Sequence, residues 1–142
     1  MMKAVLLCLM LMLAGCGVQA GRYQVSPNAA GTLAGFEALL IAQRFGLDPK
    51  PMIAAINAST GRNSTTARKI PQDILTGAYA SGFKLSLMTK DVGIAAELAR
   101  GLHVNTPFLK ETLRHWRAAQ KQLSRNADHT EIYKYQKKLT RR

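Results

Sequence analysis

Helical periodicity over residues 85–102 is the feature that most constrains the fold of this chain. With Met88 set at zero and 100° per residue, one set of apolar residues falls within about 60° of it: Leu85, Val92, Ala95, Ala99 and Leu102. This face of the helix is therefore expected to be buried. Lys90 falls at about 200°, on the opposite side, so its ammonium group is predicted to point away from the core.

Similar patterns predict helices on the N-terminal side of that segment. A helix is expected over residues 31–45, with Gly46 as its C-terminal stop, after an irregular link over residues 21–27. Asp48 and Pro49 have the residue types of a helix cap and a first turn, so a second helix is expected to begin there.

The C-terminal half shows further helix starts and no alternating strand. A short helix is expected over residues 70–75, beginning near Pro71, and a longer one after Thr106–Pro107. Asp128 and Glu131 have the spacing of a capping box before a last helix. The predicted fold class is therefore all-α, a bundle of five to six helices.

Trp116 is expected to be largely buried against neighbouring helices. It shares a helical stripe with three leucines of the segment after Pro107, namely Leu109, Leu113 and Leu123. His103, His115 and His129 have no partner at metal-ligand or catalytic spacing, so structural or solvent-facing roles are expected for them.

Length and charge limit the function classes. A chain of 142 residues is expected to form one domain with a real core. Its net charge of +12 at pH 7 is compatible with a basic nucleic-acid-binding module. However, the basic residues are spread along amphipathic helices and aromatic stacking platforms are few, so a solvated basic face is preferred and no nucleic-acid partner is expected.

The first twenty residues have the layout of a secretory signal. Lys3 precedes an apolar run over residues 4–14, and Leu13–Cys16 resembles a bacterial lipoprotein box in which Cys16 would be lipidated. The run is too short for a confident membrane span. Both cysteines, Cys8 and Cys16, lie in this stretch, so the body of the domain fits a reducing, cytoplasmic compartment.

Two loop signals precede the helix that carries Lys90. Residues 61–66 are polar and offer many hydrogen-bond donors, and within them Arg62 and Asn63 could bind a carboxylate or could simply hold the loop together. Residues 77–82 form a second break. Asp91 is expected to cap or pair near the start of the long helix.

Several short pieces of the sequence together resemble one enzyme family. They are Gly46–Pro49, Asn57–Asn63, Ser81–Phe83, Leu87–Met88 with Lys90–Asp91, and Asp128–Thr130. Their order and spacing are similar to those in the C-terminal helical domain of the β-hydroxyacid dehydrogenases, the 3-hydroxyisobutyrate dehydrogenase family, which is related to 6-phosphogluconate dehydrogenase. The resemblance covers about residues 31–139.

The resemblance implies a cofactor, partners and one site residue. In that family the lysine of the Lys-Asp pair reaches the nicotinamide cofactor, a role that falls here on Lys90. The implied partners are NAD or NADP, a small hydroxy-acid substrate, a nucleotide-binding domain and a second copy of the chain. This chain has no G-x-G-x-x-G pattern after a strand, so most cofactor contacts would lie on a domain that it lacks.

The N-terminal part departs from the family pattern. The family has a Gly-x-Gly-x-x-x-Lys pattern and paired asparagines before this domain, whereas here only Lys3 resembles the lysine and its distance from Glu37 is too long. No catalytic residue or metal site is assigned. Residues 1–30 are interpreted as an apolar leader and link, signal-like or created by truncation, and residues 31–142 as the dehydrogenase domain.

Three functions therefore stay open. The preferred one is a C-terminal dehydrogenase domain that closes over cofactor and substrate and is inactive alone. The alternatives are a lipid-anchored envelope protein that reuses the helical domain for structure or interaction, and a basic nucleic-acid-binding module.

Overall fold

The computed structural model describes residues 25–140, and this part of the chain is almost entirely helical. Its elements are α2 (Val25–Phe45), α3 (Pro49–Asn57), the π-helix η1 (Thr65–Ile74), α4 (Leu85–Gly101), α5 (Pro107–Gln122), the 3₁₀ turn η2 (His129–Glu131) and α6 (Ile132–Leu139). Within these residues the only β-type pairing is an isolated bridge between Lys84 and Asp128. The predicted all-α class is confirmed.

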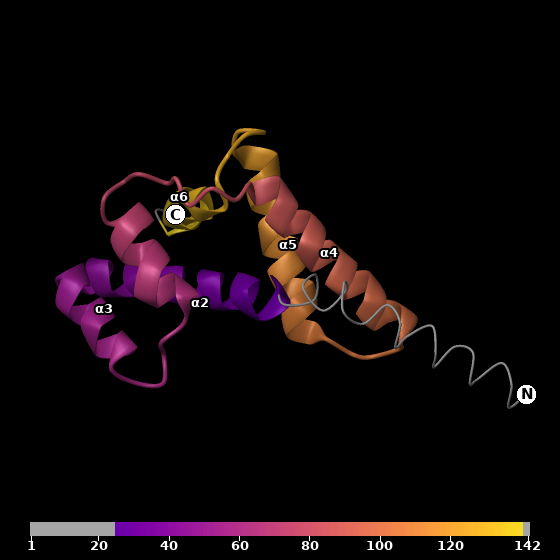
Figure 1. The fold of residues 1–142 in the computed structure, drawn as a ribbon, viewed down its shortest axis with the longest axis horizontal. Coiled ribbons are helices and arrows are strands. Elements are labelled where there is room, and N and C mark those ends of the chain that lie inside the picture. The colour runs from indigo at the N-terminus through magenta and orange to yellow at the C-terminus, as the bar shows by residue number, and fades with distance from the viewer. Residues whose placement is uncertain (1–24, 141–142) are drawn as a thin grey trace, which may run out of the picture.

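Helix α2 is the element on which the other helices pack. Figure 1 shows α4 and α5 side by side across one end of α2, with α3 and η1 at its other end and α6 between the two groups. Helices α4 and α5 form an antiparallel pair joined by a short loop, and this pair makes the most extensive helix–helix contact of the described residues.

The first described helix begins earlier than the sequence predicted. Helix α2 starts at Val25, so the part of the expected irregular link that the structure describes, residues 25–27, is helical, and so is the rest of the region up to residue 30. Pro27 is compatible with this because it lies in the first turn, where a backbone N–H has no helical acceptor. The leader itself lies outside the described residues.

The predicted junction between the first two helices is confirmed. Gly46 has a φ of +89°, and the Leu47 N–H donates to the Ala42 carbonyl at 3.0 Å, which is the pattern of a glycine-terminated helix. The Asp48 carboxylate then accepts a 3.0 Å hydrogen bond from the backbone N–H of Lys50 and caps α3, with Pro49 in the first turn.

The short helix near Pro71 was predicted wrongly in extent and in start. It runs over Thr65–Ile74, so Pro71 lies inside it, and it has π-type geometry, with the Leu75 N–H donating to the Ile70 carbonyl five residues earlier. Its start is set by Asn63, whose side-chain oxygen accepts from the N–H groups of Thr65 and Thr66 at 2.8 and 3.1 Å.

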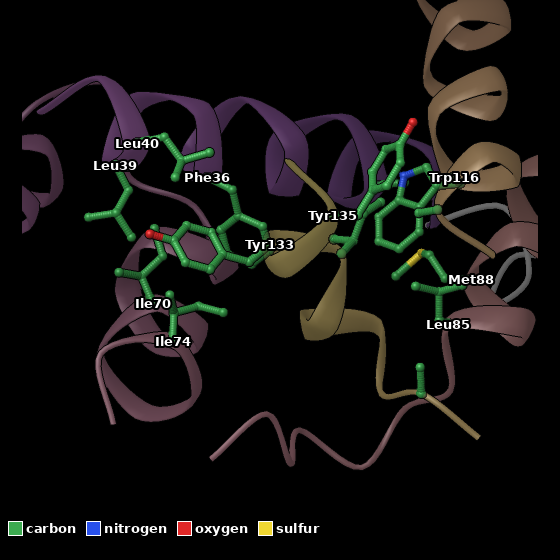
Figure 2. Close-up of a cluster of buried hydrophobic side chains, with 14 of the residues drawn as sticks. Phe36, Leu39, Leu40, Ile70, Ile74, Leu85, Met88, Trp116, Tyr133 and Tyr135 are labelled. Carbon is green, nitrogen blue, oxygen red and sulfur yellow. The ribbon is translucent and has the colours of Figure 1, made fainter. Parts of the chain in front are cut away.

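The hydrophobic core has two adjoining parts that meet at α6. Figure 2 shows Tyr133 of α6 directed toward Phe36 and Ile70 on one side, whereas Tyr135 lies toward Trp116 on the other. The rings of Phe36 and Tyr133 meet edge to face at 5.4 Å. Trp116 has no exposed surface, which confirms the prediction that it is buried.

The expected buried stripe of α4 is confirmed only for its first half. Leu85, Met88 and Val92 are buried, but Leu102 is 62% exposed. Figure 1 shows the reason: the C-terminal half of α4 extends past the end of α2, and α5 is the described helix that lies beside it.

Candidate functional site

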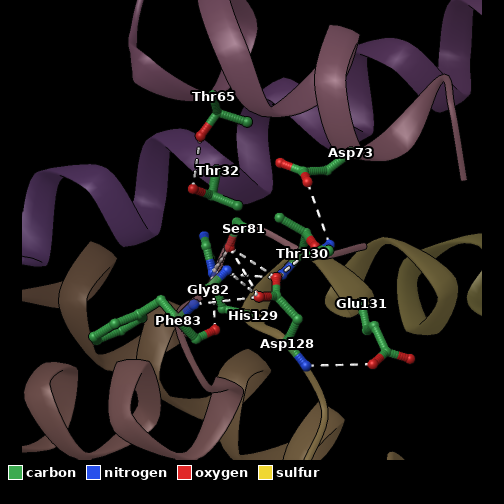
Figure 3. Close-up of polar contacts among 11 residues, drawn as sticks. Thr32, Thr65, Asp73, Ser81, Gly82, Phe83, Asp128, His129, Thr130 and Glu131 are labelled. Atoms are coloured by element: carbon green, nitrogen blue, oxygen red, sulfur yellow. Dashed lines mark hydrogen bonds and ion pairs between the residues drawn. The ribbon is translucent and has the colours of Figure 1, made fainter. Parts of the chain in front are cut away.

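The carboxylate of Asp128 is the centre of a hydrogen-bond cluster that joins two distant parts of the chain (Figure 3). One oxygen accepts from the Ser81 hydroxyl at 2.8 Å and from the N–H and hydroxyl of Thr130 at 2.9 and 2.6 Å. The other oxygen accepts from the backbone N–H groups of Gly82 and Phe83 at 3.0 and 3.2 Å. The family-like pieces at residues 81–83 and 128–130 therefore form one structural unit.

The pKa of Asp128 reflects these contacts. Burial alone would raise the pKa of this carboxyl, but the hydrogen bonds from Thr130 and Ser81, with the nearby His129, hold it below the usual value. The predicted capping box is also confirmed, because Glu131 accepts from the backbone N–H of Asp128.

This cluster fixes the position of the α4 N-terminus. The first helical residue, Leu85, donates its N–H to the Ala127 carbonyl at 2.9 Å, and His129 donates its N–H to the Phe83 carbonyl at 2.8 Å. Helix α4 has no side-chain cap of its own at Lys84. Its start is therefore held by contacts with residues 127–129, and Lys90, in the second turn, takes its position from them.

His129 has the local structural role that the sequence predicted. Its ring is buried, with the Nδ1 atom 2.9 Å from the Ser81 hydroxyl and 3.2 Å from the Phe83 carbonyl, and it stacks on Trp116. Because a carbonyl can only accept, Nδ1 carries the proton in the neutral ring. The Nε2 atom is buried and has no hydrogen-bond partner among the described residues.

The other two histidines do not join this cluster. His115 is half-buried and packs edge to face on Tyr135 at 5.4 Å, whereas His103 is exposed after the end of α4 with a φ of +56°.

Stability is expected to decrease when the pH falls through the ordinary histidine range. Burial lowers the pKa of His129, and the Lys69 ammonium lowers it further against the smaller opposing effect of Asp128. An unfolded histidine titrates near pH 6.5, so below about pH 6.5 the unfolded chain binds a proton that the folded chain does not. The free energy of unfolding should be level above about pH 7 and lower at pH 5.5.

Urea denaturation at pH 7.5 and pH 5.5 checks this. His129→Asn keeps a donor near the Nδ1 position and should make the difference between the two pH values smaller. Burial also lowers the pKa of His115, so His115→Asn is the companion variant that measures its share. An unfolding free energy that rises between pH 7.5 and pH 5.5 would contradict the assignment.

Lys90 lies on the outer surface of α4, as the periodicity predicted. Its side chain is 63% exposed, and its only charged neighbour among the described residues is Asp91, with 4.0 Å between Nζ and Oδ1. It lines a groove of about 390 Å³ between α4 and α5 whose other walls are mostly polar: Ser86, Thr89, Gly93, Ile94, Glu97, Arg117 and Gln120. This volume is at the low end for sites that hold a small ligand.

Arg117 and Gln120 of α5 share this groove, and the sequence had not singled them out. Their only sequence signal is a shared exposed face of α5, three residues apart, within a helix rich in basic residues. A larger groove, of about 1110 Å³, lies at the other end of the molecule between the ends of α2 and α6 and contains none of the predicted site residues.

The polar loop at residues 61–66 is not part of the Lys90 groove. Asn63 uses its side-chain oxygen to cap η1, and Thr65 is buried with its hydroxyl 2.8 Å from that of Thr32. Arg62 is exposed and makes no side-chain hydrogen bond within the described residues. The loop therefore holds itself together, which was one of its two expected roles.

Three residues discussed from the sequence, Lys3, Cys8 and Cys16, lie outside the described residues, so the lipid-anchored alternative stays a prediction. Within residues 25–140, no helix has the length and apolar character needed to cross a membrane. That same part of the chain has no group of three or more histidine, cysteine or acidic residues placed to hold a metal ion.

Comparison with known families identifies the fold that carries Lys90. A family model described as the NAD-binding domain of NADP-dependent 3-hydroxyisobutyrate dehydrogenase matches residues 28–136, which is most of the chain. This chain belongs to that family. The match includes α4, the Asp128 cluster and the whole of the Lys90 groove.

Relatives of known activity are longer than this chain. A 3-hydroxyisobutyrate dehydrogenase of Drosophila melanogaster mitochondria is 33% identical over 124 residues, which cover 80% of this chain and 38% of that protein. A 2-(hydroxymethyl)glutarate dehydrogenase of Eubacterium barkeri is 35% identical over 72 residues, 51% of this chain and 24% of the relative. The matched segments thus span well under half of these relatives.

Solved structures agree with the fold. A 3-hydroxyisobutyrate dehydrogenase from Salmonella typhimurium superimposes with a TM-score of 0.76 at 20% identity, over 85% of this chain and 42% of that chain. A Mycobacterium tuberculosis 3-hydroxyisobutyrate dehydrogenase, solved with L-serine, gives a TM-score of 0.74 at 20% identity.

Proposed function

We propose that this chain is the C-terminal helical domain, residues 31–142, of an NAD(P)-dependent β-hydroxyacid dehydrogenase. In this role the domain closes over the cofactor and a small hydroxy acid. The observation that carries the proposal is the placement of Lys90: an exposed lysine beside a polar groove, on a helix whose start is fixed by Asp128. Membership of the family supports the oxidoreductase class.

The residues of the groove fit one end of a dinucleotide. An ammonium on a flexible stem suits a ribose hydroxyl or a carboxamide oxygen, and the one ion pair of Lys90 among the described residues, with Asp91, is long at 4.0 Å. Arg117 adds a second cation on the facing helix, suited to an anionic group. The bound nicotinamide would supply the hydride acceptor, while this chain would bind and orient it and exclude water on one side.

The chain alone is expected to show no dehydrogenase turnover. The residues that it contributes contact only one end of the cofactor, and no described helix start carries a glycine-rich phosphate site. Purified chain mixed with NAD or NADP and a short β-hydroxy acid should give no increase in absorbance at about 340 nm. Turnover that a substitution within this chain abolishes would contradict the expectation.

A chimaera tests the proposed role. Residues 28–136 would replace the matching segment of the Drosophila relative, and NAD and NADP binding would be measured by calorimetry after circular dichroism has confirmed the helical content. The chimaera should bind the cofactor at least about tenfold more tightly than the remaining part of the relative alone, a difference of roughly 1.4 kcal/mol. A folded chimaera that binds no better than that part would refute the proposal.

A further inference from the structure

Helix α4 carries a second apolar stripe, which faces solvent. Leu87, Ile94, Leu98 and Leu102 are 41%, 39%, 42% and 62% exposed, and at 100° per residue they fall within about 80° of one another. Lys90 borders this stripe on the side of the groove. The stripe continues past the end of the helix through Val104 and Phe108, which are 54% and 86% exposed.

Exposed side chains of this size in one line mark an interaction surface. Four large residues along one face of a helix are the pattern of a surface that takes an extended or helical apolar segment. Another group of exposed large apolar residues in the described chain, Ile41, Phe45 and Leu47, lies at the far end of α2 beside the larger groove.

We propose that the stripe binds the chain's own apolar run, residues 4–14. That run, AVLLCLMLMLA, contains no charged residue and has too few residues to cross a bilayer. Lys3 comes directly before it, and Asp91 lies within the stripe, 4.0 Å from the Lys90 ammonium, so the stripe offers one carboxylate to a lysine at the start of the run. This occupant goes beyond the proposed function and does not depend on it.

The length of the connection supports this occupant. Residues 15–24 join the run to Val25 and can span up to about 33 Å. Helix α2 packs on α4 near its own start (Figure 1), and α4 is only about 26 Å long, so the whole stripe lies within reach. The larger groove at the far end of α2 is a further 31 Å or so from Val25, which makes it the less accessible apolar surface.

Disulfide trapping in the full chain tests the proposal. The sequence has two cysteines, so Cys16→Ser leaves Cys8, within the apolar run, as the single native thiol. A second thiol is then placed on the stripe by Leu98→Cys or, separately, by Leu102→Cys. The matched control is Ile41→Cys, which is on α2 beside the larger groove and is 70% exposed.

Under mild oxidation, each stripe variant should form an intramolecular bond to Cys8 at least about tenfold faster than the control, because docking raises the local thiol concentration. Mass spectrometry of the digested protein identifies the linked peptides. Equal rates in stripe and control variants would overturn the proposal. Disulfide bonds that form mainly between two chains would also overturn it, and would assign the stripe to a second copy. Recovery of protein that has lost residues 1–15 would overturn it as well, because the apolar run would then be absent.

Discussion

Asp128→Ala should reduce the free energy of unfolding by about 3–5 kcal/mol, the range for removing one partner from a buried charged network. The carboxylate is 11% exposed and accepts from the backbone of Gly82, Phe83 and Thr130. Without it these N–H groups lose their acceptor, and each such loss costs roughly 1–3 kcal/mol where water cannot replace it. The start of α4 should loosen as a result.

Urea denaturation at pH 7, followed by far-UV circular dichroism, measures this change. Glu111→Ala is the control, because Glu111 is exposed and pairs only with Arg114 on the surface, so its removal should leave the unfolding free energy close to that of the unaltered chain. Asp128→Asn keeps one carbonyl acceptor and should lie between the two. A loss for Asp128→Ala no larger than that of the control would show that the cluster does not hold α4.

Trp116→Ala should lower the unfolding free energy by a similar amount, about 3–5 kcal/mol. Trp116 has no exposed surface, and its ring stacks on His129 and packs in the part of the core that contains Leu85 and Met88. The substitution leaves a cavity beneath the Asp128 cluster that the surrounding helices can fill only in part.

Thermal unfolding of Trp116→Ala and of a control variant, Phe108→Ala, measures this loss. Phe108→Ala removes another large aromatic side chain from the same helix, but Phe108 is 86% exposed, so its melting temperature should change by less than about 2 °C. Trp116→Ala should lower the melting temperature by more than 10 °C or prevent folding. Equal effects for the two variants would mean that Trp116 contributes little to the core.

The sequence predicted correctly those helix ends that are fixed by residues close by in the chain. Gly46 ends α2 and Asp48 caps α3 through contacts within a few residues, so their residue types were sufficient. The helix near Pro71 was predicted with the wrong start, because that start depends on Asn63 and on the buried Thr65, whose hydroxyl meets that of Thr32 thirty-three residues earlier. Leu102 was predicted to be buried because periodicity gives the direction of a side chain but not where the partner helix ends.

The candidate site was likewise predictable only where the signal is local. Periodicity placed Lys90 on the outer face of α4, and its functional role came from the resemblance alone. Arg117 could not be found, since it meets the Lys90 groove through the packing of α4 on α5. The Asp128 cluster joins residues about 45 positions apart, and only its capping box left a local pattern.

The most direct measurement of the central claim is cofactor affinity of the chimaera with Lys90→Ala. A hydrogen bond from a charged donor contributes roughly 1.5–3 kcal/mol, so the dissociation constant for NAD or NADP should increase about tenfold or more. The melting temperature should stay unchanged, since Lys90 is 63% exposed and contacts only Asp91 among charged groups of the described chain. Lys138→Ala, an exposed lysine on α6, should change neither quantity. Unchanged affinity together with a lower melting temperature would contradict the account and make Lys90 a structural residue.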